Sequence, residues 1–299
     1  MIVRSFAAGV EVLAPAKLNV FLEILGRRRD GYHELETLMV TIDLADILTF
    51  HDDPSGVVSL ECSEPSMPRG SENLVVRAAE RLRAWARAEG DDRPLGAAIT
   101  LDKRIPARAG LGGGSSDAAA TLAGLDRLWN LGTPAERLDA LAGELGSDVP
   151  FFGRNAKAAI CRGRGEVVEP LADPHPLTFV LVEPPLGVST ESVYRHVSIP
   201  DRPRSVEPVR AALLGGDFVE LGRLMFNRLQ EVAESLVPDL VPIRRALADL
   251  GSSLDGRLMS GSGSTYFGLC RDGQAAKDAA RRLDELGLGR VRVVAGGVN

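Results

Sequence analysis

Aromatic side chains are scarce in this sequence of 299 residues, of which only 5% are Phe, Trp or Tyr. Positively charged residues are also in the minority: the sequence has 35 Lys and Arg but 41 Asp and Glu, which gives a net charge of −6. An acidic chain with few rings lacks the basic surface and stacking platforms of a general nucleic-acid-binding protein. Any cation or ring near a ligand site therefore carries more weight.

Cysteine is limited to Cys62, Cys161 and Cys270, and no Cys-x-x-Cys spacing occurs. An odd number of widely spaced cysteines argues against structural disulfides and zinc sites, and predicts three small buried thiols in a reducing compartment. Long hydrophobic runs are missing too. No segment approaches the roughly 20 apolar residues of a membrane span, and the N-terminus lacks a signal-peptide pattern. We therefore expect a cytoplasmic protein with no membrane association.

Glycine is concentrated in one place, where residues 106–116 read PARAGLGGGSS and hold four glycines in eleven positions. Backbone N–H groups at the start of a helix, with no side chains in the way, form a site for phosphate. The segment lacks the lysine of a Walker loop and the context of a Rossmann GxGxxG. A flexible connection is the alternative, but Lys103 and Arg104 before the segment and the apolar helix after it favour a phosphate site.

The remaining pattern mixes strands and helices without strict alternation, which favours an α+β fold. We expect strands at 40–50, 57–62, 97–105, 177–184 and 290–297, and one that ends the segment 259–270. Helices are expected at 72–88, from about Ser116 to Trp129, at 133–145, twice within 206–250, and at 275–287. The pattern changes near residue 160, which predicts domains at 1–160 and 161–299.

Four further segments carry candidate chemical groups. Lys17 lies in the near-apolar stretch APAKLNV, where it is either a strand-end lysine or a functional cation. Asp148 lies between a helix end and an apolar run, as an N-cap or as a general base. The segment 30–35, DGYHEL, is a hairpin tip or a polar recognition element, and 261–264, GSGS, is a turn suited to close backbone approach.

Together these segments resemble the GHMP small-molecule kinase superfamily. The resemblance rests on APAKLN at 14–19, DGYHEL at 30–35, the glycine segment at 106–116, GSDVPFF at 146–152 and MSGSGS at 259–264, all in the superfamily's order. It covers most of the chain, and Ala107-Arg108-Ala109 departs from a pattern richer in glycine. It implies a ribosomal-S5-domain-2-like N-terminal domain and a ferredoxin-like C-terminal domain, with ATP between them.

The resemblance also implies roles for particular residues. Asp148 would accept the proton of the attacking hydroxyl, and Lys17 would hold Asp148 ionised and help neutralise the transferred charge. The residues implied in ATP binding are Asn73, Lys103, Pro106, Ala107, Arg108, Ala109, Gly110, Leu111, Gly112, Gly113, Gly114, Ser115 and Ser116, with Ser116 also a contact for Mg²⁺. The residues implied in substrate recognition are Asn19, Tyr32, His33, Thr190 and Tyr194.

The activity that the resemblance implies is ATP- and Mg²⁺-dependent phosphorylation of the 2-hydroxyl of 4-diphosphocytidyl-2-C-methyl-D-erythritol, a step of non-mevalonate isoprenoid biosynthesis. Phosphoryl transfer needs positioning and charge neutralisation more than a covalent nucleophile. Another small-molecule kinase of the superfamily is the nearest alternative, and Tyr32-His33 argues against it. A non-catalytic nucleotide-binding regulator would not need both Lys17 and Asp148, and an RNA-binding protein fits the acidic charge poorly. We expect a monomer or a homodimer.

Overall fold

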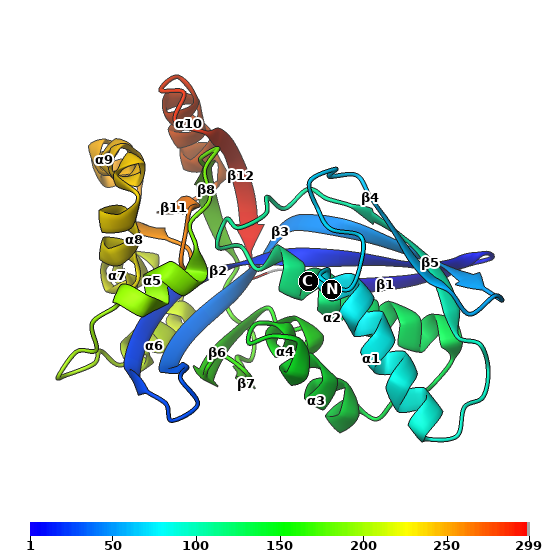
Figure 1. Ribbon diagram of the computed structural model, residues 1–299. Coiled ribbons are helices and arrows are strands. Elements are labelled where there is room, and N and C mark those ends of the chain that lie inside the picture. Colours follow the sequence, from blue (N-terminus) through cyan, green and yellow to red (C-terminus); the bar gives the residue numbers. More distant parts are fainter. Residues whose placement is uncertain (298–299) are drawn as a thin grey trace.

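The structure is a computed structural model that describes residues 1–297, and it mixes helices with one large, mainly antiparallel sheet (Figure 1). Its strands are β1 (Ile2–Phe6), β2 (Gly9–Arg27), β3 (His33–Asp53), β4 (Val58–Cys62), β5 (Gly96–Asp102), β6 (Ala158–Gly163), β7 (Val167–Pro170), β8 (Leu177–Glu183), β9 (Phe226–Asn227), β10 (Gly256–Met259), β11 (Tyr266–Cys270) and β12 (Arg290–Gly296). Its α-helices are α1 (Leu74–Ala88), α2 (Gly113–Trp129), α3 (Ala135–Leu145), α4 (Val149–Gly153), α5 (Thr190–His196), α6 (Glu207–Gly215), α7 (Phe218–Leu224), α8 (Gln230–Leu236), α9 (Val241–Asp249) and α10 (Gly273–Asp284).

The long hairpin of β2 and β3 runs through both halves of the molecule (Figure 1). One path through the sheet has the order β1-β2-β3-β12-β8-β11-β10, so the last strand of the chain joins the N-terminal hairpin to the C-terminal strands. The register of β2 on β3 shifts between Pro15 and Ala16, and Lys17 lies opposite Thr41 just beyond that shift. The irregularity is therefore next to the candidate lysine, as bulges often are beside functional sites.

The expected α+β composition is confirmed, and the expected strands and helices are found, with corrections to the number of helices in 206–250 and to the starts of α2 and α3. Four helices, α6 to α9, fill the stretch 206–250 in place of the two expected, because Gly215–Gly216, the short strand β9 and Pro238 interrupt it. Helix α3 begins at Ala135 with Pro134 in the cap position and no side-chain capping bond. The N–H of Thr133 is instead bonded to Asp126 Oδ1 at 2.8 Å, which ties the residue to the preceding helix.

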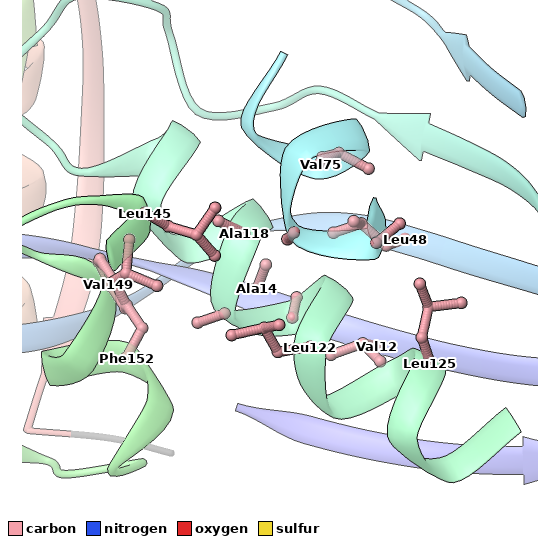
Figure 2. Packing of buried hydrophobic residues seen from close by; sticks show 14 of the residues in the cluster. Val12, Ala14, Leu48, Val75, Ala118, Leu122, Leu125, Leu145, Val149 and Phe152 are labelled. Carbon is pink, nitrogen blue, oxygen red and sulfur yellow. The ribbon is translucent and has the colours of Figure 1, made fainter. Parts of the chain in front are cut away.

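The N-terminal core lies between α2, α1, α4 and the sheet (Figure 2). The inward row of α2 is buried as predicted and consists of Ala118, Leu122, Leu125 and Trp129. In the close-up of Figure 2, Ala118, Leu122 and Leu125 lie among Val12 and Ala14 of β2, Val75 of α1 and Val149 of α4. Burying each large apolar side chain contributes on the order of 2 kcal/mol. The packing therefore fixes the axis of α2, whose N-terminus carries the glycine segment.

The C-terminal half packs α8, α9 and α10 against β8, β10 and β11 in a separate apolar cluster. Residue 160, where the sequence pattern changes, lies within β6, which pairs with β3. The division of the chain at this residue stays a prediction. All three cysteines are free and buried, as expected. In residues 1–297, no helix combines the length and the apolar character that a membrane crossing requires.

Candidate active site

A cleft of about 1120 Å³ lies where the glycine segment, β2, β3, α5 and the turn at 261–262 meet. All the predicted site residues line it except Asn73 and Ser116. Asn73 instead caps α1 by accepting the N–H of Val75 and donates to the carbonyl of Pro68. Ser116 is completely buried in α2, and its Oγ has no hydrogen-bond partner within the described part of the chain. The neighbouring Ser115 does reach the cleft.

The glycine segment is held from two sides by backbone contacts. The carbonyl of Leu111 accepts the N–H of Lys17 at 3.0 Å, and the carbonyl of Ala109 accepts the N–H of Thr265 at 3.1 Å. Gly110 has φ +76°, and a Cβ there would lie 2.1 Å from the carbonyl oxygen of Ser260. Only glycine fits this approach, so the segment is a fixed loop packed against the GSGS turn and not a flexible connection.

Helix α2 begins at Gly113, three residues earlier than expected, because Gly112 adopts a left-handed conformation at the cap with φ +72°. Its first turn therefore contains Gly113, Gly114 and Ser115, all of which line the cleft. The first N–H groups of a helix have no partner within it, and here no bulky side chain covers them. A helix start of this kind is suited to an anion, and the start of α2 opens on the cleft.

Arg108, the departure from the glycine-rich pattern, is exposed on the cleft side of this loop. Its φ of +55° lies in the left-handed region, which a residue with a side chain seldom adopts. Gly187 gives it room, since a Cβ at that glycine would lie 3.3 Å from the Cβ of Arg108. The side chain leaves the path of the loop itself unobstructed, and a phosphate contact by Arg108 stays a prediction.

Lys17 is a buried cation in the floor of the cleft, with its side chain only 4% exposed. Its ammonium group donates to Asn19 Oδ1 and to the carbonyl of Gly110, the latter at 2.7 Å. It also lies 3.9 Å from Asp148 Oδ2. Burial lowers the pKa of Lys17, while Asp148 and, to a smaller extent, Cys161 oppose that shift. The cation therefore joins the glycine segment to the candidate base.

Asp148 occupies the cap position of α4, but its side chain makes no capping bond. The carboxylate is 30% exposed and faces the cleft beside Lys17. The Asp148 side chain therefore does not cap the helix, and its carboxylate is free to act on a bound molecule. A carboxylate next to a buried ammonium, at the end of an anion-binding loop, is an arrangement suited to proton removal during phosphoryl transfer.

Rings and cations gather at the other end of the cleft. His33 and Tyr194 contact each other with centroids 5.5 Å apart, and the guanidinium of Arg164 lies 5.0 Å from the centroid of Tyr32. Burial, and then the charge of Arg27, lowers the pKa of His33, so the ring is neutral at neutral pH. Burial, and then Asp148, raises the pKa of Tyr194, which keeps its hydroxyl protonated. The cleft is therefore lined by two uncharged rings, those of His33 and Tyr194.

The structure adds residues that sequence reasoning missed. Arg27, Arg164 and Arg195 line the ring end of the cleft, although no local pattern distinguishes them from surface arginines. Thr190 Oγ1 lies 2.8 Å from Ser262 Oγ, so α5 is tied to the GSGS turn at the cleft wall. Asn19 was predicted to contact substrate, but its side chain accepts a hydrogen bond from Lys17 and donates one to Thr37 Oγ1 at 2.8 Å. Its placement makes it a support for Lys17 within the cleft.

Comparison with known proteins defines the class to which this site belongs. The chain matches the family models of the GHMP kinases N terminal domain over residues 73–155 and of the GHMP kinases C terminal domain over residues 209–287. The expected two-domain GHMP kinase fold is confirmed by these matches and by the structural neighbours. A homoserine kinase from Cytophaga hutchinsonii, 20% identical, has the same fold with a TM-score of 0.73 and covers 100% of this chain and 98% of its own.

Much closer relatives carry one particular name. The 4-diphosphocytidyl-2-C-methyl-D-erythritol kinase of Pelotomaculum thermopropionicum is 43% identical over 92% of this chain and 95% of its own length. That of Shouchella clausii is 40% identical over 86% and 84%. A crystal structure of 4-(cytidine 5'-diphospho)-2C-methyl-D-erythritol kinase has a TM-score of 0.78 at 40% identity and covers 97% of this chain and 100% of its own. The chain therefore belongs to the GHMP kinases and, within them, to the 4-diphosphocytidyl-2-C-methyl-D-erythritol kinase family.

Proposed function

We propose that this protein transfers the γ-phosphate of ATP to the 2-hydroxyl of 4-diphosphocytidyl-2-C-methyl-D-erythritol. It is an ATP-dependent small-molecule kinase, as its family membership implies. One observation carries the assignment of the chemistry: the Lys17–Asp148 pair, 3.9 Å apart, lies between an anion-binding helix start and a cleft end lined by rings. A donor phosphate and an acceptor alcohol that bind at these two ends would meet at the pair.

The proposed chemistry divides the work among three groups. Asp148 accepts the proton of the attacking hydroxyl, which makes the nucleophilic oxygen more negative. That oxygen forms a bond to the γ-phosphorus as the bond from this phosphorus to the β–γ bridging oxygen breaks, and ADP leaves. Lys17 neutralises negative charge that spreads over the transferred group. The N–H groups at Gly113, Gly114 and Ser115 hold the phosphates in line with the acceptor. No covalent intermediate on the protein is required.

Mg²⁺ fits this site as an ion carried by the nucleotide. Within residues 1–297, no three His, Cys, Asp or Glu side chains form a metal-binding group. Mg²⁺ commonly keeps several waters and binds through substrate phosphates and few protein oxygens. When bound, it would neutralise charge on the phosphate oxygens. Ser115 lines the cleft, so its hydroxyl is the candidate contact, whereas Ser116 Oγ is buried and Ser116 does not line the cleft.

The ring end of the cleft suits a pyrimidine nucleotide. Base stacking on an aromatic side chain is sequence-tolerant and worth about 1–3 kcal/mol per base, and Tyr32, His33 and Tyr194 offer such surfaces. Arg27 and Arg164 add positive charge that matches a diphosphate. A small acceptor such as mevalonate or homoserine has neither a base to stack on these rings nor a diphosphate to pair with these arginines. We also propose a cytoplasmic location, which the three free, buried thiols support.

The test is a comparison of acceptors at saturating ATP. The protein is offered the cytidyl compound, mevalonate, homoserine and galactose in parallel, and ADP release is measured. We expect turnover of the cytidyl compound alone. Turnover of one of the other alcohols, with none of the cytidyl compound, would overturn the proposed substrate while leaving the kinase chemistry intact.

A further inference from the structure

A buried cluster of Asp46, Lys103 and Asp117 lies directly behind the phosphate loop. Lys103 Nζ lies 2.5 Å from Asp46 Oδ2 and 2.9 Å from Asp117 Oδ2. The three side chains are 0%, 6% and 2% exposed for Asp46, Lys103 and Asp117. They come from β3, from the segment just after β5, and from α2. Charges this deeply buried are costly unless they are paired, so the cluster has a fixed geometry.

The cluster connects the two ends of the loop. Asp46 Oδ1 accepts the N–H groups of Arg104 at 2.6 Å and Ile105 at 2.9 Å, immediately before Pro106. Asp117 lies in the second turn of α2, immediately after the phosphate-binding turn. Lys103 bridges the two carboxylates. The entry and the exit of the loop are thus joined through a single ammonium group.

The first turn of α2 packs tightly against the segment before the loop. A Cβ on Gly113 would lie 3.0 Å from Ile105 Cγ2 and 3.2 Å from Lys103 Nζ. The segment that Asp46 holds is therefore the surface on which the start of α2 rests. A displacement of Ile105 would move the N–H groups that face the cleft, because the helix start lies against it.

We propose that Asp46, Lys103 and Asp117 are positioning residues that set the affinity of the phosphate loop for the nucleotide. Lys103 lines the cleft, but both carboxylates hold its ammonium group, so it acts through the loop. The inference rests on the proposed function, since it assumes that the loop binds ATP. It assigns to Asp46 a role in nucleotide affinity that its position in a long strand does not suggest.

The experiment compares two substitutions that change charge equally. Asp46→Asn retains an oxygen for the two N–H groups, whereas Asp46→Ala removes it, and each leaves Lys103 paired with Asp117. We expect Asp46→Ala to raise the KM for ATP and the Kd for ADP by about tenfold or more. Asp46→Asn should raise both constants by a clearly smaller factor, because it loses the ion pair with Lys103 but keeps an acceptor for the two N–H groups. The KM for the alcohol substrate should be unchanged in both variants. A smaller folded fraction would lower the apparent kcat but would raise neither the KM for ATP nor the Kd for ADP.

Asp102→Ala is the matched control, because it breaks an exposed ion pair between the last residue of β5 and Arg104. Asp117→Ala, which leaves Lys103 paired with Asp46, answers the same question if Asp46→Ala does not fold. A folded Asp46→Ala or Asp117→Ala protein with the wild-type Kd for ADP would overturn the inference. Equal effects in Asp46→Ala and Asp46→Asn, or the same effect in Asp102→Ala, would also overturn it. A wild-type protein that binds no ADP would overturn the proposed function itself, and the inference with it.

Discussion

Replacing Asp148 by Asn removes the proposed base while keeping the size of the side chain. General bases contribute about 10²- to 10⁴-fold to rate, so we expect turnover to fall by about 100-fold or more, which corresponds to about 2.7 kcal/mol of activation free energy. The substitution also removes the charge 3.9 Å from Lys17, an interaction with an upper scale of about 4 kcal/mol at an effective dielectric constant of 20. Because burial already lowers the pKa of Lys17, losing this partner should lower it further.

The assay separates chemistry from binding. ADP release gives kcat, and calorimetry gives the affinity for ATP, which should stay within a few-fold of wild type because the loop N–H groups are untouched. Asp139→Asn is the matched control, since Asp139 is 28% exposed and also pairs with a cation, Arg154, at 2.6 Å. Asp139 lies on α3 and does not line the cleft, so the Asp139→Asn variant should have the turnover of the wild type. Near-wild-type turnover of Asp148→Asn would refute the assignment of the base.

Three further substitutions test other parts of the account. Gly110→Ala places a Cβ 2.1 Å from a carbonyl oxygen at φ +76° and should raise the KM for ATP by about tenfold, whereas Gly143→Ala, in open space on α3, should not change it. Tyr32→Ala should raise the KM for the cytidyl compound by about tenfold and leave that for ATP unchanged, as the loss of a stacking surface predicts. Burial alone would raise the pKa of Glu23, but hydrogen bonds, above all the one from the Arg228 side chain, hold this pKa below its ordinary value of 4.5. The Glu23 carboxylate therefore stabilises the fold above pH 4.5, and this stabilisation is lost as the pH falls through the lowered pKa. Denaturant titrations should show a smaller loss of stability below pH 4.5 in Glu23→Gln, and an unchanged acid response would contradict this reasoning.

Local patterns in the sequence predicted the helices and strands with one buried face. The apolar row of α2 has helical spacing, and the row is buried as expected. Strand β2 was missed because its middle is buried on both faces, so that apolar residues do not alternate with polar ones, and because Pro15 interrupts it. The start of α2 was placed three residues late, since glycine is a poor helix former and Gly113 and Gly114 are helical only because tertiary packing supports them.

The candidate site was predicted where a residue type is unusual in its local setting. Lys17 in an apolar stretch and the glycine segment are of this kind, and both line the cleft. Asp46 and Asp117 escaped notice because an aspartate in a strand or a helix has no local signature when its partner is 57 or 14 residues away. Only the folded chain brings such groups together. The same holds for the arginines at the ring end of the cleft.

The most direct test of the central claim is the position of the new phosphate on the product. Carbon 2 of a 2-C-methyl compound bears no hydrogen, so a phosphate on its oxygen has no three-bond coupling to a proton. We predict that ³¹P NMR of the product formed from the cytidyl compound and ATP shows one new phosphomonoester resonance, a singlet, beside the two diphosphate resonances. A proton-coupled phosphomonoester resonance, from transfer to a primary or secondary hydroxyl, would contradict the account, and so would the absence of a new resonance.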